Sequence, residues 1–203
     1  MAYVNPLHAP VSSSHRSGYS SIGGAVHNAP EPSKFLSPFR RHLPQATYTP
    51  ISKWRTSTGR TNTLHNTVTF DFLGYNKQGV PMRELSTRGS HALAAMIHGA
   101  NDLVLAHTRL TRITLVIIWP GYEHVEWSRT VEIHPDGPIT RSALGAAVAM
   151  NFARFMEKSR NERAMSPEWQ IGISGIRFEH VILLSLRNVF EDVWQADVAV
   201  DLR

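Results

Sequence analysis

The alternation of apolar and polar residues is clearest over residues 110–160, where it predicts a β-hairpin followed by an amphipathic helix. The run Ile113–Trp119 is rich in β-branched side chains, which is typical of a buried strand. A turn signal, Pro120 with Gly121, separates it from a stretch of strict alternation. Because successive side chains of a strand point to opposite faces, this alternation predicts one dry face and one wet face. The dry positions are Val125, Trp127, Val131 and Ile133, and the wet positions are Glu126, Ser128, Thr130 and Glu132.

Helical spacing of apolar residues follows and predicts a helix over residues 140–158. Thr140 or Ser142 is suited to cap it, because a hydroxyl at a helix start accepts a hydrogen bond from a free backbone N–H. Gly145 and Ala149 are small residues four apart, which allows the helix to lie close to a sheet. The apolar stripe consists of Leu144, Ala147, Val148, Phe152, Phe155 and Met156.

Three strands and one helix are predicted in the rest of the chain. Residues 68–75 are predicted to form the first strand. A helix is predicted to begin at Ser86 or Ser90 and to extend to residue 104, and Gly99 either ends it early or lies inside it. Residues 176–186 indicate a buried strand, and residues 194–202 alternate in a way that allows antiparallel pairing with it. The apolar stripe of the first helix is Leu93, Met96, Ile97, Ala100, Leu103 and Val104.

The resulting order, β-α-β-β-α-β-β, predicts a single α+β domain over residues 67–203. Its first six elements favour a ferredoxin-like antiparallel sheet with two helices on one face, and the seventh element adds an extra edge strand. The alternative is a different α+β sheet in which the terminal hairpin packs centrally. The polar connection over residues 161–175 is predicted to be a loop that Trp169 anchors to the body.

Residues 1–66 are predicted to be a disordered basic arm. The first 50 residues are rich in Pro, Ser, Gly and His without sustained periodicity, so they cannot bury enough apolar surface to offset the entropy of ordering. The arm holds seven basic residues against Glu31 alone, while the remaining chain holds fourteen basic and fifteen acidic residues. This imbalance indicates an anionic partner such as nucleic acid, an acidic protein or a membrane surface, and the alternative is a solubilising tail without a partner.

Composition excludes several classes of protein. The 203 residues are 42% hydrophobic, but no apolar run approaches the roughly 20 residues of a membrane helix, which predicts a soluble chain without a membrane partner. The absence of cysteine excludes disulfides, thiol nucleophiles and cysteine-ligated zinc. It fits a reducing compartment, so an intracellular location in cytoplasm or nucleus is expected.

The sequence carries no recognisable catalytic motif. It contains no G-x-S-x-G elbow, Walker loop, H-E-x-x-H or G-x-G-x-x-G pattern, so no enzymatic activity and no cofactor are predicted. Eleven histidines invite a metal hypothesis, but His91 and His98 on one predicted helix lie about 10 Å apart along its axis. No metal site is therefore predicted.

One candidate site lies in the basic arm. Lys53, Trp54, Arg55 and Arg60 place three cations around one indole, and cations contact phosphates while an indole stacks on a base. These residues form a candidate nucleic-acid contact. The alternative is structural, with Trp54 covering an apolar edge of the domain.

A second candidate is an anion or ligand site built from Arg129, His134 and Thr140. The start of a helix offers free N–H groups to an anion, and Thr140 stands at such a start. Arg129 breaks the dry face of its strand, which is costly for a cation without a partner. It either pairs with Asp71 or Glu132, or faces a ligand at the open end of the sheet.

Three stretches carry a resemblance to a known group of proteins. They are Trp119–His124, Gly137–Thr140 with Asn151–Phe155, and Phe190–Asp197. Residues 110–203 resemble, through these stretches, an uncharacterised family of predicted proteins from mushroom-forming fungi. The resemblance implies a fungal source and carries no activity, ligand or site residues.

These observations favour a non-enzymatic interaction or structural module that binds an unknown protein partner or a second copy of itself. The alternative is a nucleic-acid-binding protein that contacts RNA or DNA through residues 34–60. A basic arm on a near-neutral body also suits a coat protein that packages nucleic acid, a variant that predicts self-assembly.

Overall fold

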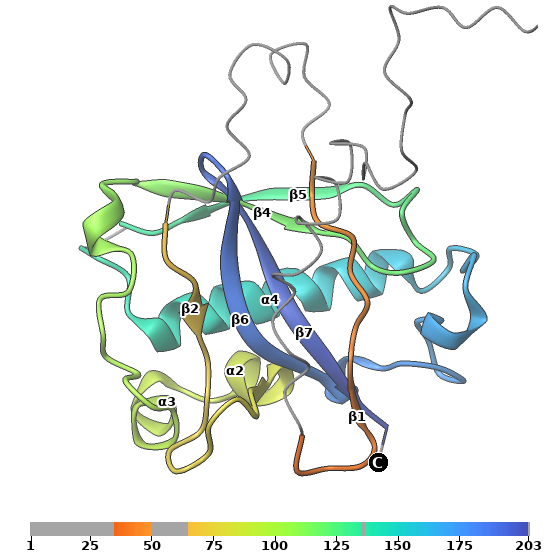
Figure 1. Cartoon of the computed structure of the whole chain (residues 1–203), viewed down its shortest axis with the longest axis horizontal. Helices are drawn as coiled ribbons and strands as arrows, with labels where there is room; N and C mark the ends of the chain where they lie inside the picture. The colour runs from red at the N-terminus through yellow and green to blue at the C-terminus, as the bar shows by residue number, and fades with distance from the viewer. Residues whose placement is uncertain (1–34, 50–64, 135–136, 203) are drawn as a thin grey trace, which may run out of the picture. The chain divides into compact units, whose positions relative to one another are not determined.

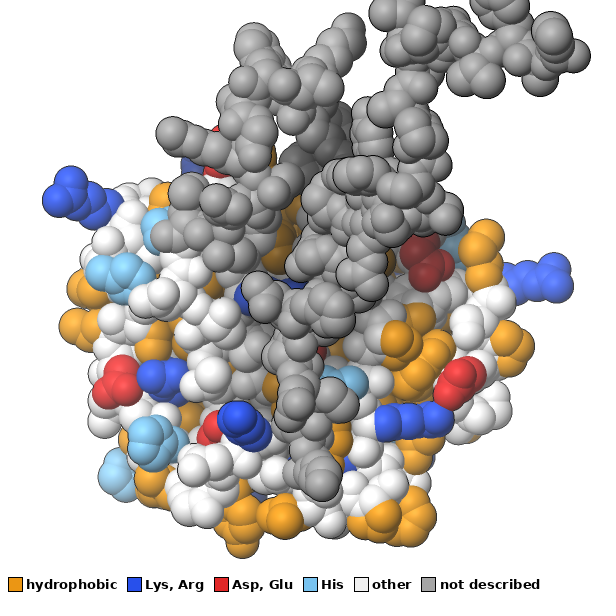
Figure 2. All heavy atoms as spheres, viewed as in Figure 1, with side chains coloured by type: hydrophobic (Ala, Val, Ile, Leu, Met, Phe, Trp, Pro, Cys, Tyr) orange, Lys and Arg blue, Asp and Glu red, His pale blue; other side chains and the backbone are white. Residues whose placement is uncertain are grey.

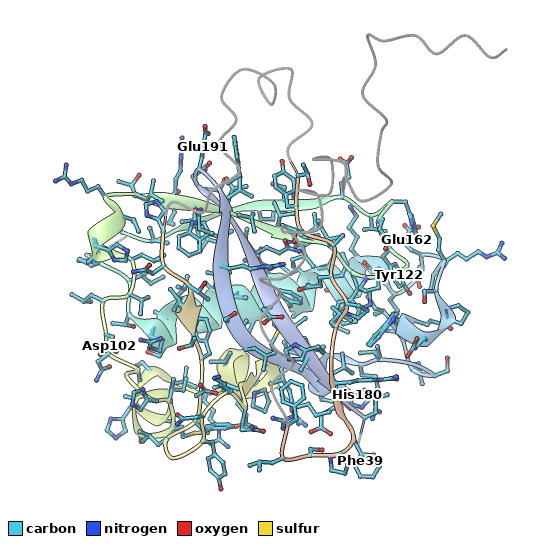
Figure 3. All side chains as sticks on the ribbon, viewed as in Figure 1. Phe39, Asp102, Tyr122, Glu162, His180 and Glu191 are labelled. Atoms are coloured by element: carbon cyan, nitrogen blue, oxygen red, sulfur yellow. The ribbon has the colours of Figure 1, made fainter. Side chains whose placement is uncertain are left out.

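Two long strands form the centre of the sheet. The computed structural model describes residues 35–49, 65–134 and 137–202. Within it β6 (Val181–Phe190) and β7 (Val193–Asp201) pair antiparallel and lie in the middle of the order β2-β6-β7-β4-β5 (Figure 1). Glu191 stands at the tip of their hairpin with a φ of 39° (Figure 3). Both strands are rich in Val, Ile, Leu and Ala, as expected for strands covered on both faces.

Five shorter strands complete a seven-stranded mixed sheet. β4 (Arg112–Ile117) pairs in parallel with the first half of β7 and antiparallel with β5 (Trp127–Glu132). β1 (Arg40–His42) pairs antiparallel with the second half of β7. On the other side, β2 (Val68–Thr69) and β3 (Val80–Pro81) both pair with β6. The β4–β5 hairpin is confirmed, and its predicted dry positions are all buried.

The long helix α4 (Arg141–Ser159) crosses behind β6 and β7 in the view of Figure 1. Thr140 caps it as predicted, because its Oγ1 accepts a hydrogen bond from the N–H of Ala143 at 3.3 Å. Gly145 lets the helix pack closely, since a Cβ added there would lie 3.1 Å from both Phe70 and Leu85. The buried stripe of the helix includes Leu144, Val148, Ala149, Phe152, Phe155 and Met156.

The predicted helix over residues 90–104 is shorter than its apolar spacing indicated. It forms α3 (Ser90–Met96) and ends where Ile97 becomes extended and bridges to Phe72. Gly99 follows with a φ of 62°, in the left-handed region that ends helices. The stripe residues after Ile97 lie outside the helix. Among them Ala100 is buried, Val104 is partly buried and Leu103 is exposed.

The short helix α2 (Met82–Thr87) was not predicted as a separate element. Met82 and Leu85 are three residues apart and fully buried, a helical signal too short to recognise beside the loop that precedes it. Three short 3-10 turns are η2 (Ala106–Thr108), η3 (Pro167–Trp169) and η4 (Phe178–His180).

The α+β class is confirmed, but the predicted place of the last strand is wrong. The ferredoxin-like arrangement made the final strand an edge, whereas β7 lies between β6 and β4. The burial of β7 gives the physical reason. Trp194 and Val198 are fully buried on one face, and Gln195 and Ala199 are fully buried on the other. The alternative with a central terminal hairpin matches this arrangement.

Part of the predicted disordered arm belongs to the folded body. Residues 35–49 include β1, and Leu43 is buried in the core. The amide of Gln195 holds the chain beyond β1, because its oxygen accepts from the N–H of Tyr48 at 3.1 Å and its nitrogen donates to the carbonyl of Ala46 at 2.8 Å. The boundary at residue 67 is therefore too late for this segment. The rest of the predicted arm, residues 1–34 and 50–64, lies outside the described residues.

The loop after α4 is hydrogen-bonded to the turn that follows β4. The indole N–H of Trp119 donates to the carbonyl oxygen of Trp169 at 2.8 Å, and the hydroxyl of Tyr122 accepts from the N–H of Ile171 at 3.0 Å (Figure 3). Trp169 is 7% exposed, so its predicted anchoring role is confirmed.

Candidate functional site

The sheet ends at β5, and this strand is paired on one side only. In the part of the chain that the structure describes, its one strand partner is β4. β1, β2 and β3 are two or three residues long, whereas β5 has six residues. A row of unpaired N–H and C=O groups on an edge strand is a template for an added strand. β5 is therefore the longest such template in the described sheet.

The outward-pointing backbone groups of β5 follow from its register with β4. The N–H of Ile133 donates to the carbonyl oxygen of Thr111 at 3.0 Å, so the groups of Ile133 point toward β4. In an antiparallel pair every second residue shares this direction, and the residues between them point away. The N–H and C=O groups of Ser128, Thr130 and Glu132 therefore face outward.

The side chains at the middle of β5 are accessible. Ser128, Arg129 and Thr130 are exposed, whereas Trp127 and Val131 on the dry face are each 6% exposed. The guanidinium carbon of Arg129 lies 4.7 Å from the centre of the Trp127 ring, and its Nη1 donates to the carbonyl oxygen of Ser128 at 3.0 Å. Arg129 thus covers the indole while its charge stays in water.

This position explains why Arg129 interrupts the dry face without a buried partner. Neither acidic residue proposed for it takes that role, and no ion pair of Arg129 occurs among the described side chains. Asp71 instead accepts hydrogen bonds from the backbone N–H groups of Gln78 and Gly79 at 2.8 and 2.9 Å. Glu132 is exposed on the opposite face of β5. The predicted salt bridge is wrong.

The other members of the predicted anion site are not joined to Arg129. Thr140 is occupied as the helix cap, with its Oγ1 also 3.3 Å from the hydroxyl oxygen of Ser142. His134 is half-buried after the end of β5. Within the described ranges, no hydrogen bond, ion pair or ring contact links Arg129, His134 and Thr140.

The candidate nucleic-acid residues Lys53, Trp54, Arg55 and Arg60 all lie outside the described residues. Two other cations of the basic segment are engaged in the folded body. Arg40 forms an ion pair of 3.1 Å with Asp201, and the two side chains are only 12% and 7% exposed. Arg41 pairs with Glu168 at 2.6 Å, but both of these side chains are about half exposed.

The open edge was not identified from the sequence. The ferredoxin-like order placed residues 125–133 inside the sheet, so the strand was not examined as an edge. One signal was present, because Glu126, Arg129 and Glu132 give this strand charged side chains that edge strands often carry.

The described residues hold neither a metal cluster nor a membrane-spanning helix. Over residues 35–49, 65–134 and 137–202, no three His, Asp or Glu side chains are placed to hold a metal ion. In the same ranges no helix combines the length and apolar character needed to cross a bilayer.

Comparison with known proteins gives no relative from which a site can be transferred. No family model, curated protein or solved structure matches this chain. The resemblance of residues 110–203 to the fungal family stays a prediction.

Proposed function

We propose that this chain is a non-enzymatic interaction module that binds a partner strand along the open edge of β5. The observation that carries the proposal is a six-residue edge strand whose outward N–H and C=O groups have no backbone partner among the described residues, although the carbonyl oxygen of Ser128 accepts a hydrogen bond from the side chain of Arg129. A strand added to such an edge gains affinity from main-chain hydrogen bonds, and its alternate side chains give specificity.

The side chains of β5 suit this role. Ser128 and Thr130 are short and exposed, so they leave the outward backbone groups accessible. The guanidinium of Arg129 is held over its own Trp127 and donates to the outward carbonyl oxygen of Ser128, so it does not contact the outward groups of Thr130 and Glu132 through any hydrogen bond in the described residues. The charges of Glu126, Arg129 and Glu132 favour partner strands with a matching pattern and disfavour others.

Charged residues also occur on edge strands that avoid pairing with any other strand. A substitution that removes one outward N–H distinguishes an edge that binds a strand from an edge that prevents binding. Replacing Thr130 with proline removes an N–H that points away from β4, so the β4–β5 hydrogen bonds remain. We expect peptides selected on the full chain from a random displayed library to bind the Thr130→Pro variant at least about tenfold more weakly, because strand addition depends on outward main-chain donors. Titration of each selected peptide by fluorescence anisotropy measures the difference.

The matched control is Thr130→Val, which changes the same side chain but keeps the N–H. Binding by this variant should stay within about twofold of the original chain. Circular dichroism of both variants checks that the sheet is retained. If no peptide is selected, or if selected peptides bind the proline variant as well as the original chain, strand addition at β5 is wrong.

Nucleic-acid binding is the second candidate, and the concentration of charge in residues 1–66 favours it. Arg40 and Arg41 are used in ion pairs of the body, which leaves Lys53, Arg55 and Arg60 beside Trp54 as the densest basic segment. On the described face shown in Figure 2, Lys and Arg side chains are scattered among neutral and acidic ones. The proposed contact is accordingly the segment around Trp54.

The test is a variant of the full chain that carries Lys53→Ala, Arg55→Ala and Arg60→Ala. A truncation before residue 67 would also remove β1, so substitution is the sharper change. We expect its binding to mixed RNA and DNA to weaken, and the slope of log affinity against log salt to flatten by about one per lost phosphate contact. Filter binding across a salt series gives both quantities.

A triple variant at the end of α4 and its C-cap, with Arg154→Ala, Lys158→Ala and Arg160→Ala, removes the same charge from exposed positions of the body. This control should bind like the original chain. Equal losses in the two triple variants would mean that only net charge matters. No binding by the original chain at low salt would end the nucleic-acid proposal.

A further inference from the structure

We infer that the partner strand of β5 is β5 of a second copy of this chain, paired antiparallel with Thr130 facing Thr130. This inference rests on the proposed function of the β5 edge and names its occupant. Two seven-stranded sheets would then continue into each other across a twofold axis.

Symmetry limits the registers that such a pairing allows. Each sheet has one face in the hydrophobic core, so the two cores must lie on the same side of the joined sheet. A twofold axis perpendicular to the sheet meets this condition, and it requires that residues of the same face oppose each other. The axis therefore passes through a residue and not between two residues. Because β5 spans Trp127–Glu132, axes through Arg129 and Thr130 give the longest overlap.

Charge distinguishes these two registers. With the axis at Arg129, the two arginines oppose each other, and Glu126 of each copy opposes Glu132 of the other. Like charges directly opposite destabilise a pair of strands. With the axis at Thr130, no like charges are directly opposed. Thr130 then faces its own equivalent, a favourable cross-strand pair.

The remaining pairs of the Thr130 register are also compatible. Ser128 faces Glu132 of the second copy, so a hydroxyl donor meets a carboxylate acceptor. Arg129 faces Val131, while each guanidinium stays over its own Trp127. At the ends, Glu126 of one copy lies toward His134 of the other.

The outward backbone groups of β5 are compatible with this register and equally with the Arg129 register, in which Ser128 faces Thr130, so charge alone decides between the two. The residues whose N–H and C=O groups face outward are Ser128, Thr130 and Glu132, as derived from the bond between Ile133 and Thr111. An axis at Thr130 opposes Ser128 with Glu132, Thr130 with Thr130, and Glu132 with Ser128. All three are hydrogen-bonded pairs, which gives about six inter-chain hydrogen bonds. Two of these are accepted by the carbonyl oxygens of Ser128, which use their second lone pair or replace the hydrogen bond from Arg129.

The absence of cysteine makes this register directly measurable. In the Thr130 register the two Cα atoms at position 130 lie about 5.5 Å apart, within the range that a disulfide bridges. The two Cα atoms at position 128 are offset by four residues along the strands, about 13 Å, which a disulfide cannot span. The full chain carrying Thr130→Cys is therefore compared with the full chain carrying the equally exposed Ser128→Cys.

Both variants are incubated in a glutathione redox buffer over a series of protein concentrations, and dimers are quantified on non-reducing gels. We expect the Thr130→Cys chain to form about tenfold more disulfide-linked dimer than the Ser128→Cys chain, because the geometry allows only the first bridge. In the unsubstituted chain, hydrogen–deuterium exchange at Ser128, Thr130 and Glu132 should slow as the protein concentration rises.

Equal cross-linking of the two variants, or none in either, overturns the inference, as does exchange that is independent of concentration. The peptide experiment with Thr130→Pro then separates the remaining explanations. If selected peptides still depend on the N–H of Thr130, the edge binds a different protein and only the identity of the partner is wrong. If they do not, the proposed function fails as well.

Discussion

Replacing Arg40 with methionine is expected to lower the free energy of unfolding by about 3 kcal/mol, because it removes the guanidinium from a nearly buried ion pair with Asp201. The same guanidinium also donates to the carbonyl oxygen of Gln78, so one side chain connects β1, β7 and the turn before β3. Methionine keeps most of the length and apolar contact of the arginine. Urea unfolding of the full chain, followed by tryptophan fluorescence, measures the loss.

The neighbouring residue provides a matched control. Arg41→Met removes the same charge from the same strand, but the pair of Arg41 with Glu168 is about half exposed, so a loss of about 0–1 kcal/mol is expected. A large difference between the two variants would establish that β1 is an integral part of the sheet. Equal, small losses would mean that residues 35–49 do not contribute to the stability of the body.

Replacing Trp119 with alanine is expected to lower the free energy of unfolding by about 3–5 kcal/mol, the usual cost of truncating a fully buried tryptophan. Two losses combine here. The cavity deprives Phe155, whose ring centre lies 6.3 Å from that of the indole, of part of its packing. The carbonyl oxygen of Trp169 also loses the indole N–H that fastens the loop after α4.

Trp119→Phe separates these two contributions, because it keeps an aromatic ring and removes the N–H. Its expected loss is about 1–3 kcal/mol, the cost of an unsatisfied buried acceptor with a smaller cavity. Limited proteolysis between residues 160 and 171 should be faster in both variants. If the phenylalanine variant is as stable as the original chain, the bond to Trp169 does not stabilise the loop.

Local periodicity predicted the elements that are long and strongly patterned. Alternation located the β4–β5 hairpin and its two faces, and a hydroxyl before a helical stripe located the start of α4 at Thr140. The same reasoning overestimated α3, because apolar spacing does not reveal that Ile97 is held by Phe72 in an extended bridge. Such long-range contacts override helical spacing.

Strand order and the candidate site depended on contacts that periodicity does not contain. The parallel pairing of β4 with β7 joins residues about eighty positions apart, and nothing in either strand alone specifies the other. The ferredoxin-like order of the first six elements placed β5 in the interior of the sheet and concealed its open side. Arg129 was recognised as an exception to the dry face, but its place above Trp127 required the register and the end of the sheet to be known.

The central position of β7 also determines when this fold is completed during synthesis. β1, β4 and β6 all hydrogen-bond to β7, so a nascent chain that has not yet released residues 193–201 lacks the strand that joins the two halves of the sheet. The two strands of the β4–β5 hairpin are synthesised close together and can pair early. β1, in contrast, cannot pair until β7, about 160 residues downstream, has been synthesised. A large sequence separation between pairing strands slows folding and leaves unpaired strand edges accessible to chaperones and to neighbouring nascent chains. In the described sheet the open side of β5 is one such edge, because the β4–β5 hairpin can form before β7 is available to pair with β4.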